Sequence, residues 1–85
     1  MSQKDDLIKR LRSYPKDFEI RELDSLMSKC NCQKGNRGNT SGSAIEYSHV
    51  PTRRIFNCHS PHPEKELKKY VLKEAVIFLE SVGEI

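Results

Sequence analysis

The chain has 85 residues, of which 35% are hydrophobic and 32% charged, and it contains no tryptophan. A chain of this length builds one modest hydrophobic core, which limits it to one compact domain with one principal site. Its formal net charge of +3 weakly favours an acidic partner, either nucleic acid or an acidic protein. No run approaches the roughly 20 apolar residues that cross a bilayer, and the first residues lack the apolar stretch of a signal peptide. We therefore expect a cytoplasmic protein without membrane contact.

Helical periodicity predicts two helices in the first third of the chain. Residues 2–12 carry apolar side chains at helical spacing, and Ser2 and Asp5 are placed as a capping box. A Tyr-Pro-Lys-Asp break follows, and residues 18–29 then predict a second helix with Asp17 as its N-cap. The apolar face of this second helix comprises Ile20, Leu23, Met27 and Cys30. Such a stripe is ordinary core, so we assign it no functional role.

The middle of the chain alternates apolar and polar residues in the manner of half-buried strands. Residues 44–50 and 54–59 predict the two strands of a hairpin, joined by a turn at 51–53. Before them, residues 31–43 are rich in Asn, Gly, Ser and basic side chains. This composition predicts a polar loop with one short strand near 32–34.

The last part of the chain has the periodicity of an amphipathic helix. We predict this helix over residues 64–82, with Pro63 near its start and Gly83 just after its end. Its apolar face comprises Leu67, Val71, Ala75, Phe78 and Val82. Together the elements predict a single α+β domain in which helices pack on one face of one sheet.

The three cysteines, Cys30, Cys32 and Cys58, are an odd number in a chain without an export signal. We therefore expect reduced thiols rather than disulfides. A zinc site formed by these thiols with His59 or His62 is the alternative, since thiolate and imidazole are good zinc ligands. Because Cys-x-Cys is tighter than the usual spacing of zinc ligands, we expect no metal and no cofactor.

Three short motifs, in this order, resemble the toxin of HicA/HicB toxin–antitoxin pairs. They are Ser-Gly-Ser at 41–43, Pro-His at 61–62 and Lys-Glu-Leu-Lys-Lys at 65–69. That family typically reads Gly-Ser-His, then a proline and a histidine, then Lys-Glu-Leu-Lys-Lys. The resemblance makes residues 18–85 the matching core and residues 1–17 an added helical extension of the same domain. The joint order and spacing are more specific than any one motif.

The resemblance implies both a fold and an activity. The fold is that of a double-stranded-RNA-binding domain, with a three-stranded antiparallel sheet and helices on one face. The activity is that of a type II toxin, an endoribonuclease (mRNA interferase) that cleaves messenger RNA by acid–base catalysis without a metal. The implied partners are RNA and a HicB-like antitoxin protein that covers the active face of the toxin.

The chain departs from the family at the residue that follows Gly-Ser. This residue is usually histidine, and arginine in some related sequences, whereas here it is Ala44. A methyl group neither moves a proton nor stabilises charge, so position 44 is where the resemblance implies that a catalytic group is missing. Two interpretations stay open. Either alanine was introduced so that a toxic protein could be produced, or other residues carry the chemistry in this branch.

Histidines are the candidates for the remaining proton transfers, because the imidazole pKa lies near neutrality. His62 matches the second histidine of the family, although the residue that usually separates it from proline is absent here. His59 is the next candidate, and both rank above His49. An exposed or structurally paired histidine is the ordinary alternative for each.

Basic and small residues supply the candidate RNA contacts. They are Lys34, Arg37, Ser41, Gly42, Ser43, Lys65, Lys68 and Lys69. The lysines recur at three- and four-residue intervals, so several share one side of the last helix and can contact phosphates. The ordinary alternatives are a solvated helix face, a solubilising loop and a commonplace turn. Tyr47 and Phe56 can stack on bases, but each falls in a strand that must bury one face, so we expect both in the core.

Two functions besides that of an active toxin stay open. A catalytically silent RNA-binding domain needs the same fold and the same basic face, and Ala44 favours it. A module that binds an antitoxin through this surface is compatible with either function. Histidine or arginine at position 44 would separate a disabled toxin from a binding module.

Overall fold

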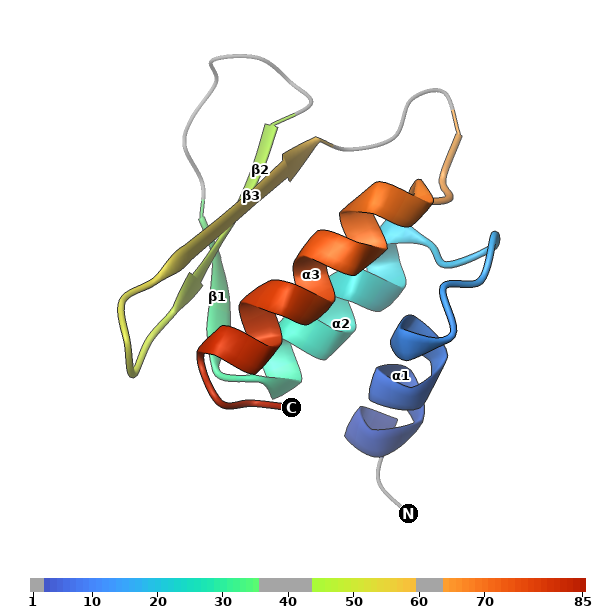
Figure 1. Cartoon of the computed structure of the whole chain (residues 1–85). Helices are drawn as coiled ribbons and strands as arrows, with labels where there is room; N and C mark the ends of the chain where they lie inside the picture. Colours follow the sequence, from blue (N-terminus) through green and yellow to red (C-terminus); the bar gives the residue numbers. More distant parts are fainter. Residues whose placement is uncertain (1–2, 36–43, 60–63) are drawn as a thin grey trace.

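A computed structural model describes residues 3–35, 44–59 and 64–85 of the chain. Its elements are α1 (Gln3–Arg12), α2 (Ile20–Lys29), β1 (Cys32–Gly35), β2 (Ala44–His49), β3 (Ile55–His59) and α3 (Lys69–Ser81). The strands form one antiparallel sheet in the order β1–β2–β3. Helices α2 and α3 pack against one face of this sheet, and α1 packs on the side of these helices that faces away from it (Figure 1). The predicted α+β class, with a three-stranded antiparallel sheet, is confirmed.

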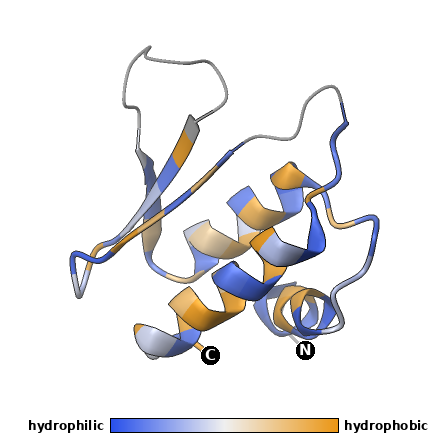
Figure 2. Cartoon of the chain, turned by 45° about the horizontal axis from the view of Figure 1, so that its top comes forward, coloured by the Kyte–Doolittle hydropathy of each residue, from blue (hydrophilic) through white to orange (hydrophobic). Residues whose placement is uncertain are grey.

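The hydrophobic core lies between the sheet and the two helices that cover it. Its members include Leu23, Leu26, Met27, Tyr47, Phe56, Leu72, Ala75 and Leu79. Hydrophobic and hydrophilic positions alternate along the helices in Figure 2, as expected for elements that bury one side. Each fully buried aliphatic or aromatic side chain contributes about 1.5–3 kcal/mol relative to an exposed one. This layer therefore fixes the position of the sheet relative to α2 and α3.

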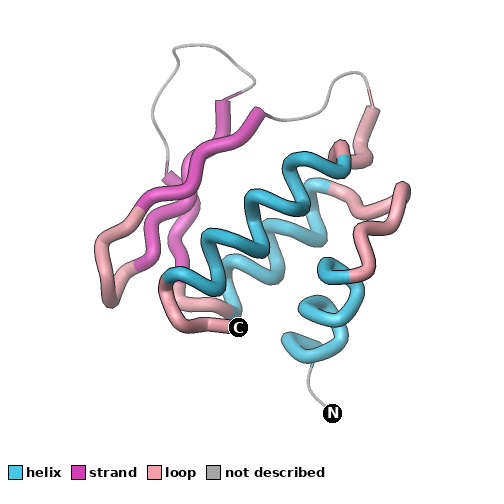
Figure 3. Tube along the Cα trace, in the orientation of Figure 1, coloured by secondary structure: helices cyan, strands magenta, loops and turns pink. Residues whose placement is uncertain are grey.

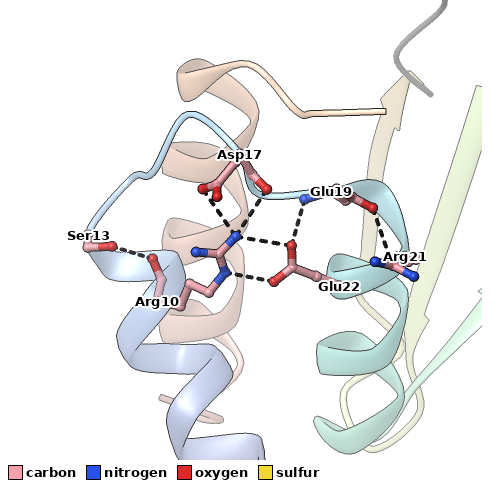
Figure 4. Close-up of polar contacts among 6 residues, drawn as sticks. All are labelled: Arg10, Ser13, Asp17, Glu19, Arg21 and Glu22. Atoms are coloured by element: carbon pink, nitrogen blue, oxygen red, sulfur yellow. Dashed lines mark hydrogen bonds and ion pairs between the residues drawn. The ribbon is translucent and has the colours of Figure 1, made fainter. Parts of the chain in front are cut away.

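Helix α2 begins later than predicted, and its N-cap is Glu19 instead of Asp17. The carboxylate of Glu22 accepts the backbone N–H of Glu19 at 3.0 Å, which satisfies one of the free donors at the start of the helix. Asp17 instead accepts a hydrogen bond from the guanidinium of Arg10 at 3.2 Å, and the same guanidinium donates to Glu22 at 2.7 Å (Figure 4). The helical extension is thereby tied to the start of α2.

Helix α3 begins at Lys69, five residues later than predicted. The preceding segment is extended because its backbone is bonded to the chain before α2. The N–H of Leu67 donates to the carbonyl of Phe18 at 2.8 Å, and the N–H of Ile20 donates to the carbonyl of Lys65 at 3.1 Å. Leu67 is only 4% exposed, although it lies before the first residue of α3. The backbone pairing with Phe18 places it in the core, and not a position on the apolar face of the helix.

The strands and the end of α3 lie close to their predicted places. The strand predicted near 32–34 is β1, and each strand of the predicted hairpin is one residue shorter at the turn. Gly83 follows α3 with a φ of +82°, the left-handed conformation that commonly ends a helix. The predicted capping box at Ser2 lies outside the described residues. No helix in the described part of the chain is long and apolar enough to span a membrane.

Candidate functional site

The backbone register places Ala44 directly opposite His59. Ala44 is the first residue of β2 and His59 is the last residue of β3, so the pair marks one end of the sheet. His59 is exposed, and strand alternation puts it on the face opposite the one that buries Phe56. Because directly opposed residues of an antiparallel pair share a face, positions 44 and 59 belong to the same face of the sheet.

The starts of β2 and α3 and the end of β3 lie at the same end of the molecule (Figure 3). Lys65, Lys68 and Lys69 stand here with exposed side chains. Lys68 is the N-cap residue of α3 and Lys69 its first residue, whereas Lys65 belongs to the extended segment before the helix. The fold therefore gathers His59 and the predicted lysines at one end, although they are separated along the chain.

Five of the predicted site residues fall outside the described part of the chain. They are Arg37, Ser41, Gly42, Ser43 and His62. All three strands adjoin these segments, since β1 ends at Gly35, β2 begins at Ala44 and β3 ends at His59. The described part of the site thus consists of the sheet end and the start of α3.

Lys34 is held by a carboxylate that sequence reasoning did not find. Its ammonium lies 3.3 Å from a carboxylate oxygen of Asp24 on α2. Asp24 also accepts a hydrogen bond from the hydroxyl of Tyr47 on β2. Burial, together with the hydrogen bond to Asp24, raises the pKa of Tyr47. The charge of Lys34 is therefore compensated within the protein, which reduces its contribution to a phosphate contact.

His49 has a structural role, consistent with its low rank among the candidates. The side chain is 1% exposed, and both ring nitrogens are paired. Nε2 lies 2.8 Å from a carboxylate oxygen of Glu84, and Nδ1 lies 2.8 Å from the hydroxyl of Thr52. Hydrogen bonds from His49 and then Asn31 hold the pKa of Glu84 at about 2. This network fastens the C-terminal segment to the hairpin and keeps His49 from any substrate.

Tyr47 and Phe56 pack in the core, as predicted. Both are buried, and their ring centroids lie 6.4 Å apart in a stacked arrangement. Phe56 also contacts Phe78 of α3, with 5.4 Å between the ring centroids. Neither ring is available to stack on a base.

Cys30 and Cys32 are buried and Cys58 is half-buried, and all three have a raised pKa, which favours the protonated thiol. Burial raises the pKa of both Cys32 and Cys58 to about 11, which disfavours the thiolate that a metal would need. Within residues 3–35, 44–59 and 64–85, no group of three or more His, Cys, Asp and Glu side chains is placed to hold a metal ion. The zinc grouping of these cysteines with His59 is therefore not formed, and its other form, with His62, involves a residue outside the described part.

Comparisons with known proteins add no family to this description. Models of known protein families give no match to the chain, and neither curated proteins nor solved structures give one. Function is therefore inferred from the residues of the site and from the motifs of the sequence, because a fold alone does not define an activity.

Proposed function

We propose that this protein is a toxin of the HicA type, a cytoplasmic endoribonuclease fold that acts on messenger RNA, with its catalytic position at residue 44. One observation carries the proposal: residue 44 stands directly opposite the exposed His59 at one end of the sheet. The motif of the family places its usual catalytic histidine at this same position. A histidine there would complete a pair of imidazoles on adjacent strands.

The order of the elements supports the same proposal. From α2 to α3 the chain runs helix, three antiparallel strands, helix, with both helices on one face of the sheet. A double-stranded-RNA-binding-like domain has this arrangement. Helix α1 then corresponds to the extension that the resemblance leaves outside the matching core.

The chemistry explains what the alanine removes. In metal-independent RNA cleavage, a base takes the proton of the 2'-hydroxyl, whose oxygen attacks phosphorus. An acid protonates the 5'-oxygen as its bond to phosphorus breaks, and cations stabilise the charged intermediate. Ala44 supplies neither proton transfer, while His59 is available for one of them and His62 is the other candidate. We therefore expect the chain to bind RNA and to cleave it poorly.

A silent RNA-binding or antitoxin-binding module is the second candidate function, and Ala44 is the observation that favours it. Such a module would keep the lysines at the start of α3 and lose only the proton-transfer pair. A HicB-like antitoxin of acidic surface would dock over the same lysines. This function predicts RNA or antitoxin binding that is independent of the residue at position 44.

Cleavage of a long labelled messenger RNA in EDTA separates the two candidates. The unaltered chain is compared with Ala44→His, Ala44→Arg, His59→Ala and His62→Ala. Ser48→His is the matched control, because it introduces the same imidazole on the same strand, four residues from the sheet end. Cleavage by Ala44→His but not by Ser48→His supports the toxin. RNA binding by every variant without cleavage by any of them supports the silent module.

A further inference from the structure

A basic hollow lies between the α1–α2 connection and the start of α3. Its volume is about 470 Å³, and Tyr14, Lys16, Lys68 and Lys69 are among the residues that line it. The ammonium groups of Lys69 and Lys73 each lie 5.9 Å from the centroid of the Tyr14 ring. A hollow of this volume is within the range of about 300–1,000 Å³ that is typical of ligand sites. Three of its eight lining residues, Tyr14, Pro15 and Lys16, come from the extension that precedes the family-like core.

Within the described residues, none of the lysines that line the hollow forms an ion pair. Lys4, Arg10, Arg12 and Lys34 each form an ion pair with a carboxylate, but none of the lysines around the hollow does. Two glutamates also line the hollow, and neither forms an ion pair with a described lysine. Contact with the half-buried ring of Tyr14 contributes on the order of 1 kcal/mol, and it leaves the positive charge in place.

The charge pattern of α3 is the reverse of the pattern in the other two helices. Helices α1 and α2 carry acidic residues in the first turn and basic residues in the last turn, which stabilises a helix through its dipole. Helix α3 has no acidic residue in its first turn, no basic residue in its last turn and lysine at its N-cap. Each lysine at the start of α3 lowers the stability of the helix by about 0.3–1 kcal/mol. A cost of this kind is expected where a surface serves an anionic ligand.

We propose that this hollow binds backbone phosphates of a single-stranded RNA, as an extension of the site at the sheet end. The proposal rests on the proposed function and deepens it, since it assigns the N-terminal extension to the substrate surface. The end of β3, where His59 stands, and the start of α3, which contributes to the hollow, lie toward the same end of the molecule (Figure 1). Lysine ammonium groups act as point charges, which suits phosphates without selecting a base sequence.

The test measures how RNA binding depends on salt. Each phosphate contact with a single strand contributes about −0.7 to the slope of log affinity against log salt concentration. The triple variant Lys16→Gln, Lys68→Gln, Lys69→Gln should therefore reduce the slope by about 2. When the salt concentration rises from about 50 to about 200 mM, both proteins lose affinity for RNA, and the factor lost by the triple variant should be about 20 times smaller than the factor lost by the unaltered chain. The readout is fluorescence anisotropy of a labelled 20-mer RNA without stable secondary structure.

The matched control is the triple variant Lys9→Gln, Lys29→Gln, Arg53→Gln, which removes the same charge from exposed residues outside the hollow. The proposal expects little change of slope in this control. Circular dichroism checks that both triple variants keep the fold. Tyr14→Leu removes the ring that Lys69 and Lys73 contact, and we expect it to weaken RNA binding without changing the slope by more than about 1.

The outcomes separate this proposal from the proposed function. Equal slopes in the two triple variants would overturn the hollow as a phosphate site, whatever Ala44→His does to RNA cleavage. A reduced slope in the hollow variant alone supports the hollow, even where no variant at position 44 cleaves RNA. If polyglutamate binds and RNA does not, the hollow recognises an acidic protein and the proposal is overturned.

Discussion

Replacing Glu84 by glutamine should destabilise the protein in a manner that depends on pH. Glu84 accepts hydrogen bonds from His49, Asn31 and Lys4, which connect the C-terminal segment to β2, to the α2–β1 turn and to α1. Its pKa is held at about 2, against an ordinary value of 4.5. This difference corresponds to about 3 kcal/mol at neutral pH. Solvent reaches part of the carboxylate and screens it, so we expect the substitution to cost about 1–3 kcal/mol.

The sign of the pH dependence follows from the lowered pKa. Because the folded protein binds this proton less tightly than the unfolded chain, the stabilisation is complete above about pH 5 and is lost as the pH falls toward 2. At about pH 3 less than half of it should remain. The difference in free energy of unfolding between the unaltered chain and Glu84→Gln should therefore shrink from pH 7 to pH 3.

Urea denaturation followed by circular dichroism measures this difference at each pH. Glu80→Gln is the matched control, because Glu80 forms an exposed ion pair with Arg12 at 3.4 Å. Such a pair contributes at most about 1 kcal/mol. A difference for Glu84→Gln that stays constant from pH 7 to pH 3, or one no larger than that for Glu80→Gln, would refute the reasoning.

Two further predictions concern the core and the thiols. Leu67→Ala should lower the free energy of unfolding by about 2–5 kcal/mol, since Leu67 is 4% exposed. Ile77→Ala, at a residue 64% exposed, should change it by about 0.5 kcal/mol or less, and equal effects in urea denaturation would contradict the burial of Leu67. Cys58, with its pKa raised to about 11, should be only about 0.1% thiolate at pH 8 and should react slowly with Ellman's reagent in the native protein but rapidly in urea. A fast reaction in the native protein would contradict the raised pKa of this half-buried thiol.

The sequence predicts the elements well where periodicity alone decides them. The apolar spacing of residues 64–82 identified α3, and the alternation of residues 44–59 identified the hairpin. The predicted start of α3 was wrong, because Leu67 has the spacing of a helical core residue whereas its backbone N–H donates to the carbonyl of Phe18. A pairing between segments this far apart leaves no periodic signal.

The candidate site was predictable in part. The resemblance identified position 44, and His59 was predicted at the end of the hairpin. Only the strand register places these two residues opposite each other. If the register of the hairpin were shifted by one residue, His59 would lie opposite Ile45. The alternation of apolar and polar residues within each strand does not fix that register. The Asp24 carboxylate between Lys34 and Tyr47 gave no sequence signal, because the contact joins α2 to two strands.

The central claim is that residue 44 completes a proton-transfer site beside His59. Its most direct test is the rate of RNA cleavage in EDTA by Ala44→His relative to the unaltered chain and to Ser48→His. A positioned acid or base contributes about 10²–10⁴-fold, so Ala44→His should raise the rate by at least about 100-fold, and Ser48→His should not. Equal rates for Ala44→His and Ser48→His would contradict the account and leave a domain that binds without cleaving.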